Sequence, residues 1–328
     1  MAITSEMVHE YTVDDDERTV LAELAESAAV QLYAKPEAVV DQILEMPAEL
    51  RHRLLAFADD SPSGFFLIRG LETGSLPETP TTHGGTVLTT HVTTGFMVLV
   101  AELLGSLTGY ADEKGGDLVH EVHPVRGEEQ RIENTGSVAF DFHTENVHHP
   151  LRPDFLALLC LRQDHDKVAA TRVASIREAV SYLSPEHLQA LREPAFDSLY
   201  PTSFTRGSSG QRPVSPSHPV LFGNEEKPFM RFNSHNTKAR DAVGRAALQA
   251  LTEALEHVSR DVVLNPGEMV IVDNHIAAHG RSAFVARYDG KDRWLRRCYS
   301  LRSTPRWTEA MMDRPRVLPS LSGIRGVL

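Results

Sequence analysis

The feature of this sequence that most constrains its fold is the triplet His143-Thr144-Glu145. A second candidate metal ligand, His279, follows far downstream. Side chains two residues apart point to the same side of a β-strand, so His143 and Glu145 can bind one ion while Thr144 points away. His279 can complete a set of three ligands if the fold brings the two segments together. A metal site here therefore requires strands that are distant in sequence and adjacent in space.

Each of these residues also has an interpretation without a metal. Most His-x-Glu triplets lie on protein surfaces, and a single histidine after a strand is more often structural than a ligand. The local pattern nevertheless favours a strand, because apolar and polar residues alternate over 138–145. We expect Phe140 and Phe142 to face the core and His143 and Glu145 to face the other way. The following His148 and His149 are expected behind the ligands or at the surface, and additional ligands are the alternative for them.

The cysteine count limits the metal chemistry. The chain has two cysteines, Cys160 and Cys298, both in apolar or strand-like runs, and we expect buried, reduced thiols. Any metal must then be held by histidine and carboxylate groups. Two imidazoles and one carboxylate on one face of an octahedron are typical of a non-haem ferrous oxygenase. A zinc-dependent hydrolase using the same three residues is an alternative, and so is a β-sandwich binding protein without catalytic activity.

Length and charge exclude several classes of protein. With 328 residues and no mid-chain linker, we expect a single domain over residues 1–328. The formal net charge of −12 disfavours nucleic-acid binding. Residues 1–16 are polar and acidic, unlike a signal peptide, and no run of about 18 apolar residues suggests a membrane span. We therefore expect a cytoplasmic protein with no nucleic-acid or membrane partner, whose oligomeric state is not readable from the sequence.

Periodicity predicts helices at the front of the chain and scattered short strands after them. The predicted helices lie in the N-terminal part at about 17–60 and at 94–108 and 238–259. Helical pieces are predicted within 175–193, one of them starting at Ser184-Pro185. The predicted strands are 65–70, 138–142, 155–161, 169–174, 230–233, 269–273 and 294–301. This order indicates an α+β fold built on a sandwich or barrel of mostly antiparallel strands. The Gly-, Ser- and Pro-rich stretch at about 205–229 is the candidate lid loop.

A second chemical cue follows fourteen residues after His279, where Arg293 begins a segment rich in arginine. Arg293 and Arg297 are expected on one strand face, and Arg296 on the other. A guanidinium group can hold a carboxylate through two parallel hydrogen bonds, which suits an acidic cosubstrate. The alternative is a solvated cationic edge strand, which would discourage aggregation.

Taken together, several short motifs indicate a known family. They are Glu113-Lys114, Asn134-Thr135-Gly136-Ser137, Phe142 to His149, Arg152-Pro153-Asp154-Phe155-Leu156, Pro266-Gly267 and Val272 to Arg297. From about Phe65 to Ser303 the chain resembles the clavaminate-synthase-like iron(II)/2-oxoglutarate-dependent dioxygenases. Within that group it is most similar to bacterial hydroxylases of free L-amino acids, of the asparagine oxygenase and arginine hydroxylase type. The resemblance implies a double-stranded β-helix (jelly-roll) core with flanking helices.

The resemblance also implies roles for individual residues. His143, Glu145 and His279 match the iron(II) ligands, and Arg293 matches the residue that pairs with the distal carboxylate of 2-oxoglutarate. Arg297 matches the residue that holds the substrate α-carboxylate. The matches for other contacts to the amino acid are Glu113, Asn134 and Asn146. Without the resemblance, Glu113 could belong to a surface ion pair and Asn134 to a turn.

The implied reaction is hydroxylation of an unactivated C–H bond, at the β or γ carbon, with dioxygen as the oxidant. Arginine hydroxylases carry two acidic residues where this chain has Asn233 and His235, so we expect a polar side chain that is not a guanidinium. A basic amino acid paired with Glu225 or Glu226 is the alternative, as are desaturation and cyclisation. Because Glu145 is an intact carboxylate, halogenation is not expected. The resemblance also implies a role in specialised-metabolite (antibiotic) biosynthesis.

Overall fold

The computed structural model describes residues 10–83, 88–132, 135–201 and 213–324. Asn134 and the 205–212 part of the predicted lid lie outside these ranges. Within them, no helix is both long enough and apolar enough to cross a membrane.

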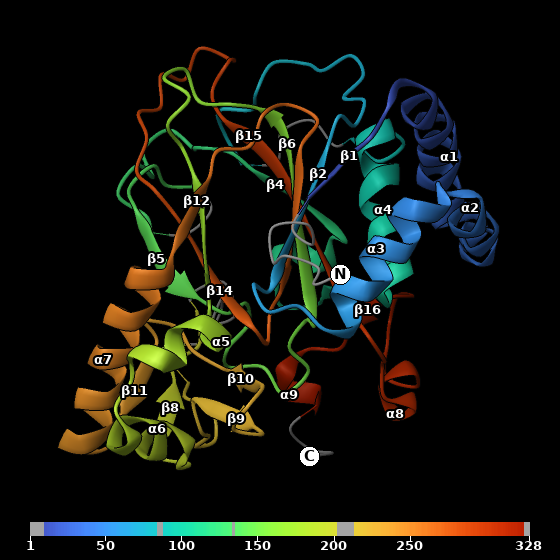
Figure 1. Cartoon of the computed structure of the whole chain (residues 1–328). Helices are drawn as coiled ribbons and strands as arrows, with labels where there is room; N and C mark the ends of the chain where they lie inside the picture. Colours follow the sequence, from blue (N-terminus) through green and yellow to red (C-terminus); the bar gives the residue numbers. More distant parts are fainter. Residues whose placement is uncertain (1–9, 84–87, 133–134, 202–212, 325–328) are drawn as a thin grey trace, which may run out of the picture.

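The larger of two main sheets has eight strands and lies at the centre of the molecule (Figure 1). Its strands are β1 Glu10–Thr12, β2 Phe65–Arg69, β3 Ser106–Tyr110, β4 Val119–Val122, β6 Phe155–Arg162, β13 Met269–Asp273, β15 Trp294–Leu301 and β16 Val317–Leu318. They run in the order β1-β2-β13-β6-β15-β3-β16, with β4 also paired to β15. All pairings are antiparallel except β1 with β2 and β16 with β3.

The smaller main sheet has four antiparallel strands in the order β12-β7-β14-β5. They are β5 Phe140–His143, β7 Thr171–Ser175, β12 Arg260–Val262 and β14 Ala277–Arg281. Val173 and Ala277 of this sheet share one buried cluster with Leu158 and Val272 of the larger sheet. The two sheets therefore face each other across an apolar layer, which holds β5 and β14 opposite the central strands.

Helices cover the other face of the larger sheet. They are α1 Asp15–Ala34, η2 Pro36–Ala38, α2 Val39–Glu45, α3 Ala48–Asp59 and α4 Val92–Leu104. The most apolar of these is α4, which packs between α1 and the sheet (Figure 1). A Cβ added to Gly95 would lie 1.7 Å from the backbone oxygen of Ala25, so only glycine permits this close approach of α1 and α4.

A second helical layer and two two-stranded sheets, β8 with β11 and β9 with β10, lie beyond the smaller sheet (Figure 1). These elements are α5 Ile176–Ala179, η4 Val180–Tyr182, α6 Pro185–Arg192, β8 Phe196–Ser198, β9 Leu221–Gly223, β10 Pro228–Met230, β11 Thr237–Ala239 and α7 Ala242–Val258. The short elements left are η3 Lys114–Gly116, α8 Arg306–Glu309 and α9 Leu321–Ile324. Ser184 caps α6 by accepting a hydrogen bond from the backbone N–H of His187, as its position before Pro185 predicts.

The structure corrects four predicted boundaries. The helix predicted at 94–108 ends at Leu104, because Gly105 breaks it and the next residues pair with β15 as β3. The helix predicted at 238–259 begins only at Ala242, capped by Asp241. The strand predicted at 230–233 is wrong, since β10 ends at Met230. The described part of the 205–229 loop contains β9, a turn and most of β10 rather than one irregular lid.

Candidate functional site

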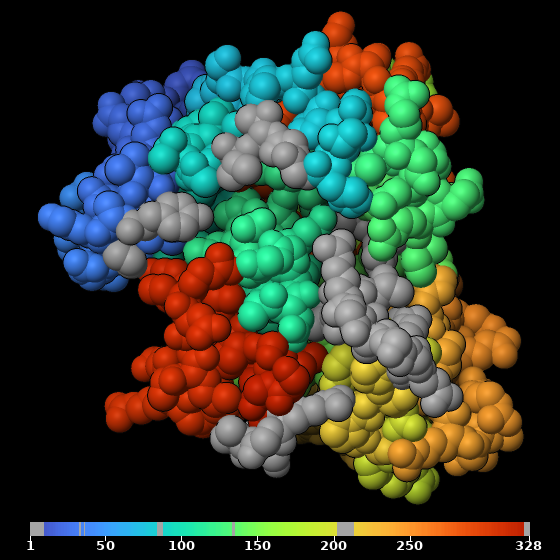
Figure 2. All heavy atoms as spheres, turned by 180° about the vertical axis from the view of Figure 1, so that it is seen from behind, coloured from blue at the N-terminus to red at the C-terminus, as the bar shows by residue number. Residues whose placement is uncertain are grey.

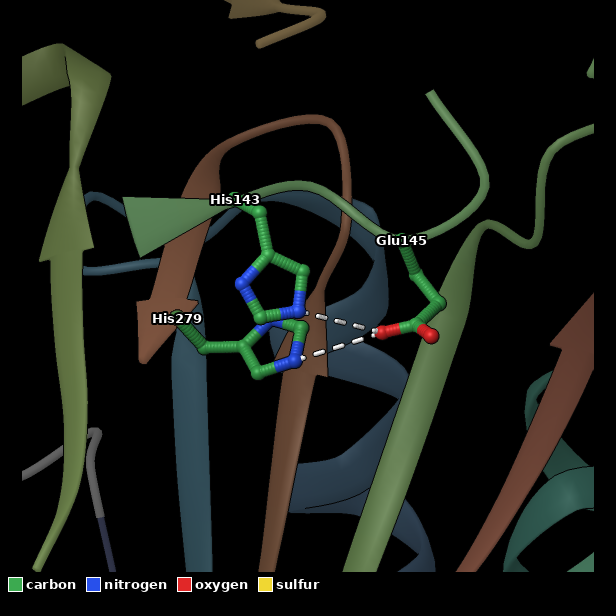
Figure 3. A group of neighbouring side chains, drawn as sticks. All are labelled: His143, Glu145 and His279. Carbon is green, nitrogen blue, oxygen red and sulfur yellow. Dashed lines mark ion pairs between the residues drawn. The ribbon is translucent and has the colours of Figure 1, made fainter. Parts of the chain in front are cut away.

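His143, Glu145 and His279 converge at one point, as the sequence predicts (Figure 3). His143 on β5 lies directly opposite His279 on β14 in the antiparallel register. The Nε2 atoms of His143 and His279 lie 3.6 and 3.3 Å from Oε2 of Glu145, and each of these side chains is at least nine-tenths buried. The pairing of two strands thus brings together residues that the sequence separates.

The means by which Glu145 reaches the histidines differs from the prediction. Strand β5 ends at His143, so Glu145 lies in the following turn and not on the same strand. Its backbone is held by Asn274, whose Oδ1 accepts from the Glu145 N–H at 2.6 Å. Asn274 Nδ2 donates to the carbonyl oxygens of Glu145 and Pro153 at 3.2 and 2.8 Å. A fully buried amide on the β13–β14 connection therefore fixes the carboxylate position.

The faces of the predicted strand also need correction. Phe142 is buried in the core as expected. Phe140 instead lies against His143, with ring centroids 4.0 Å apart and an interplanar angle of 20°. Phe140 thus fixes the plane of one imidazole. His148 and His149 are each only 1% exposed, so neither is a surface residue.

The donor set of this group fits a divalent metal ion. His143 Nδ1 lies 3.0 Å from the carbonyl oxygen of Asp141, which leaves the Nε2 lone pair directed at Glu145. Oε2 of Glu145 is buried and accepts no hydrogen bond from any described residue. Nε2 of His279 faces the same oxygen. Lone pairs that converge in a buried site repel one another unless a cation lies between them, and these ligand types suit iron.

The second oxygen of the Glu145 carboxylate is tied to a buried network. Oε1 of Glu145 accepts from Arg297 Nη1 and from the Tyr299 hydroxyl, both at 2.8 Å. Oε1 of Glu113 accepts from Arg297 Nη2 at 2.6 Å and lies 3.1 Å from the same hydroxyl. His120 Nδ1 is 3.1 Å from Arg297 Nη2. One guanidinium thus joins the predicted metal ligand to a predicted substrate residue.

Burial and Arg297 together set the charges of this network. Burial alone would raise the pKa of Glu145, but the charge of Arg297, whose Nη1 donates to Glu145 Oε1, holds it well below its usual range. For Glu113 burial outweighs Arg297 and raises the pKa. Burial, followed by the His143 imidazole, lowers the pKa of His279 to about 4. His279 is therefore neutral at neutral pH, which is the state that binds a metal.

A cavity of about 960 Å³ opens beside the three residues. Its described walls include His143, Glu145, Glu113 and Arg297, together with the segments 111–115 and 130–132. Figure 2 shows the red C-terminal segment next to the teal-green segment around residue 112, where Leu321 N–H donates to an Asp112 carboxylate oxygen. The cavity is large enough for a small organic substrate.

The other predicted substrate residues also line this cavity, apart from Asn134, which lies outside the described ranges. Asn146 has a left-handed backbone with φ of 49°, and its Nδ2 lies 3.5 Å from Glu113 Oε2. Oδ1 of Asn233 accepts the backbone N–H groups of His235 and Asn236, which fixes its side chain in an Asx turn. His235 Nε2 lies 3.1 Å from an Asp141 carboxylate oxygen at the cavity edge.

Arg293 immediately precedes β15 and does not line the cavity. It is 6% exposed, and its guanidinium carbon lies 5.8 Å from the ring centroid of Phe284. Arg296 and Arg297 are 2% and 4% exposed. The solvated edge-strand alternative is therefore wrong, because β15 is an interior strand paired with β6 on one side and with β3 and β4 on the other.

The chain matches a family described as taurine catabolism dioxygenase TauD, TfdA, over residues 64–299. It is 36% identical to L-asparagine oxygenase of Streptomyces coelicolor, over 89% of this chain and 90% of that protein. It is 32% identical to clavaminate synthase 2 of Streptomyces clavuligerus, over 87% and 89% of the two chains. Identity to an L-ornithine/L-arginine 3-hydroxylase of Catenulispora acidiphila is 33%, over 80% and 85%.

Solved structures agree with these relationships. Asparagine oxygenase in complex with Fe(II), 2S,3S-3-hydroxyasparagine and succinate superposes with a TM-score of 0.88 and 34% identity, covering 95% of this chain and 99% of that one. The non-haem iron oxygenase OrfP with Fe and alpha-ketoglutaric acid (2-oxoglutarate) gives a TM-score of 0.81 at 29% identity, covering 94% and 99%. The resemblance inferred from the motifs is confirmed, and the chain belongs to the TauD/TfdA family of dioxygenases.

Proposed function

We propose that this protein is an iron(II)/2-oxoglutarate-dependent dioxygenase that hydroxylates an unactivated C–H bond of a free L-amino acid with a neutral polar side chain. The observation that carries the proposal is the buried group of His143, Glu145 and His279 at the wall of a cavity. Family membership supports the dioxygenase chemistry. The asparagine oxygenase structure holds iron, a hydroxylated amino acid and succinate, which is the expected coproduct.

His143, Glu145 and His279 would hold the iron, which together with 2-oxoglutarate supplies the activation of dioxygen. Asn274 and Phe140 orient two of these ligands before any metal binds, one through hydrogen bonds and one by ring stacking. Arg293 is assigned to the distal carboxylate of 2-oxoglutarate because it is a buried cation with no ion-pair partner among the described residues. The wholly buried strands behind the ligands exclude water from this side of the site.

The α-amino-acid group is assigned to Glu113, Asn146 and Arg297. An α-carboxylate would take hydrogen bonds from Arg297, and an α-ammonium would pair with Glu113. Glu113 and Arg297 form an ion pair with each other in this structure. The bound zwitterion would replace that pair with two, one between its carboxylate and Arg297 and one between its ammonium and Glu113. This substitution keeps every charge paired, as a buried site requires.

The side-chain class follows from the charges of the cavity. Its described walls carry three acidic side chains, Asp112, Glu113 and Glu145, and three basic ones, Lys114, Arg131 and Arg297. Three minus three leaves no formal excess to attract a cationic side chain. Asn233 keeps its Nδ2 as a donor, since its Oδ1 is used in the turn. A donor suits the carbonyl oxygen of an amide or ureido group.

A basic substrate is the second candidate, because one relative is an L-ornithine/L-arginine 3-hydroxylase. Glu225 and Glu226, the acids that could pair with such a side chain, are exposed and do not line the cavity. The neutral side chain is therefore preferred. Desaturation or cyclisation at the same centre stays an alternative, whereas the zinc hydrolase finds no support in the family comparison.

The sheet arrangement supports the predicted jelly-roll core, since two mainly antiparallel sheets face each other with the metal group on the smaller one. We keep the single domain, the role of 205–229 as a lid and the cytoplasmic location as predictions. The hairpin of β9 and β10 would then form the base of the lid.

A turnover screen tests the proposal. Protein, iron(II), ascorbate and 2-oxoglutarate are incubated in air with each free L-amino acid, plus citrulline and ornithine, and products are followed by mass spectrometry. We expect succinate and a product heavier by one oxygen atom with a neutral polar amino acid, and neither with Glu145→Ala. Preferred turnover of arginine or lysine would contradict the side-chain class. A wild-type protein that binds no 2-oxoglutarate would contradict the dioxygenase itself.

A further inference from the structure

The C-terminal segment, residues 314–324, packs against the loop that carries Glu113. We call residues 111–116 the Glu113 loop; it follows β3, includes η3 and forms one wall of the cavity. Figure 2 shows the two segments in contact, the C-terminal one in red and the loop in teal green. The C-terminal segment lies beyond residues 64–299, which match the family, yet it reaches the wall assigned to the substrate.

The backbone of the Glu113 loop has an unusual conformation. Three consecutive residues, Lys114, Gly115 and Gly116, have positive φ angles of 49°, 68° and 81°. Glycine adopts such angles without steric cost, whereas a lysine rarely does. Inside the loop, the Gly116 N–H donates to the Glu113 carbonyl oxygen at 2.8 Å. A run of this kind keeps one shape only where the surrounding structure holds it.

The C-terminal segment holds the start of the loop through backbone pairing. Strand β16 runs parallel to β3, on which the loop begins. The Gly109 N–H donates to the carbonyl oxygen of Arg316 at 2.8 Å, and the Ala111 N–H donates to that of Leu318 at 3.0 Å. The entry of the chain into the Glu113 loop is therefore fixed by a strand from the C-terminal segment.

Two further contacts hold the loop on either side of Glu113. The Leu321 N–H donates to Oδ2 of Asp112 at 2.7 Å, and Asp112 directly precedes Glu113. The Arg314 guanidinium donates to the carbonyl oxygen of Gly115, two residues after Glu113. Glu113 thus lies between two points at which the C-terminal segment is hydrogen-bonded to the loop.

The C-terminal segment is itself anchored in the protein core. Val317 and Leu318 are buried in the two apolar clusters that lie on opposite faces of the larger sheet. The side chain of Leu321 is also buried. Arg316 forms an ion pair with Glu102 near the end of α4. The segment therefore has a fixed position from which it can hold the Glu113 loop.

We propose that the C-terminal segment positions Glu113 for the α-ammonium group of the substrate, with the Leu321 N–H and the Arg314 guanidinium as the positioning groups. The inference rests on the proposed function and deepens it, because the assigned ammonium contact then depends on a segment outside the family match. The metal ligands are held by β5, β14 and the Asn274 amide. Loss of the two contacts should therefore affect the amino acid and not the metal.

Leu321→Pro tests the first contact. Leu321 is the first residue of α9, where proline is well tolerated, and proline lacks the N–H that donates to Asp112. Leu321→Ala is the matched control, because it keeps the N–H and loses the buried side chain.

Arg314→Met removes the second contact, with Arg306→Met, an exposed arginine on α8, as its control. Arg314 is exposed, so this variant tests the inference even if a substitution at Leu321 unfolds the protein. For each variant, kcat and KM are measured with the amino acid that turns over best in the screen above. Calorimetry gives the affinities for Mn(II) and 2-oxoglutarate, and thermal unfolding reports on the fold.

We expect Leu321→Pro and Arg314→Met each to raise KM for the amino acid about tenfold over its control, as for loss of one charge-assisted hydrogen bond. The kcat and the affinities for Mn(II) and 2-oxoglutarate should stay unchanged. Unchanged KM in both variants would overturn the inference and leave the proposed function standing. An equal rise of KM in Leu321→Ala, or a parallel loss of 2-oxoglutarate affinity, would show a general structural role and overturn it too. A wild-type protein that turns over no amino acid would overturn the proposed function itself.

Discussion

Replacing Tyr299 with phenylalanine tests how the protein prepares its carboxylate ligand. The hydroxyl is 2.8 Å from Glu145 Oε1 and 3.1 Å from Glu113 Oε1, and the ring is 1% exposed. Burial, opposed by Arg297 and reinforced by the two carboxylates, keeps the Tyr299 pKa well above its usual value. The hydroxyl is therefore a permanent donor. Tyr299→Phe keeps the ring and removes only that donor.

The expected loss of stability and metal affinity in Tyr299→Phe depends on the hydrogen bonds that Glu145 keeps. A hydrogen bond to a charged group contributes about 1.5–3 kcal/mol, and loss of a group that orients a metal ligand lowers metal affinity about 10- to 100-fold. Arg297 still donates to the same Glu145 oxygen in the variant, so no acceptor is orphaned. We therefore expect losses at the lower end of both ranges: about 1.5 kcal/mol in the free energy of unfolding and about tenfold in metal affinity.

The assay combines urea unfolding of the metal-free protein with anaerobic titration of iron(II). Tyr110→Phe is the matched control, because Tyr110 is equally buried, packs edge-on against Tyr299 and donates to the carbonyl oxygen of Leu151. It should lose similar stability and keep its metal affinity. Wild-type metal affinity in Tyr299→Phe, or an equal loss in Tyr110→Phe, would refute the argument that the hydroxyl orients Glu145.

Three further outcomes are expected. Asn274→Ala removes three hydrogen bonds and leaves buried backbone groups unpaired, so it should lower the free energy of unfolding in urea by about 3 kcal/mol or more and weaken iron(II) binding. Unchanged iron(II) binding would contradict the argument that Asn274 holds Glu145 in position. Gly95→Ala should lower the free energy of unfolding by about 3 kcal/mol, because its Cβ would lie 1.7 Å from a backbone oxygen. Gly323→Ala is the control, since its Cβ meets nothing closer than 3.7 Å and should leave stability nearly unchanged. Equal stability of the two variants would contradict the close packing of α1 and α4. Burial raises the pKa of Cys160 and Cys298 to about 12, so a thiol reagent should label neither in the native protein and both after unfolding; rapid native labelling would contradict their burial.

The sequence predicted the elements with strong local signals. Alternating or continuous apolar residues located β2, β6, β13 and β15, and a serine followed by proline located the start of α6. Strands of two to five residues such as β3, β14 and β16 were missed, because short runs carry little periodicity and are formed by pairing with distant strands. For the same reason the sequence placed His279 only after the strand at 269–273, although it lies within a strand of its own, β14.

The site was predictable where residue type limits the chemistry. His143, Glu145 and His279 were found from their spacing and from the motif resemblance, and the structure brings them together. Tyr299 and Asn274 were missed as partners of Glu145, since a tyrosine in a strand and an asparagine after one have no signature until the fold places them. Arg281, which follows His279 by two residues, also had no role assigned from the sequence, because only its burial in the folded protein distinguishes it from a surface arginine.

The central claim is tested most directly by the fate of dioxygen. Protein, iron(II), 2-oxoglutarate and the amino acid that turns over best are incubated under ¹⁸O₂, and both products are analysed by mass spectrometry. The proposed function predicts one ¹⁸O atom in the amino acid product and one in succinate, in equal amounts, and no reaction without dioxygen. A product that carries oxygen from water alone, or that forms without 2-oxoglutarate consumption, would contradict a 2-oxoglutarate-dependent dioxygenase.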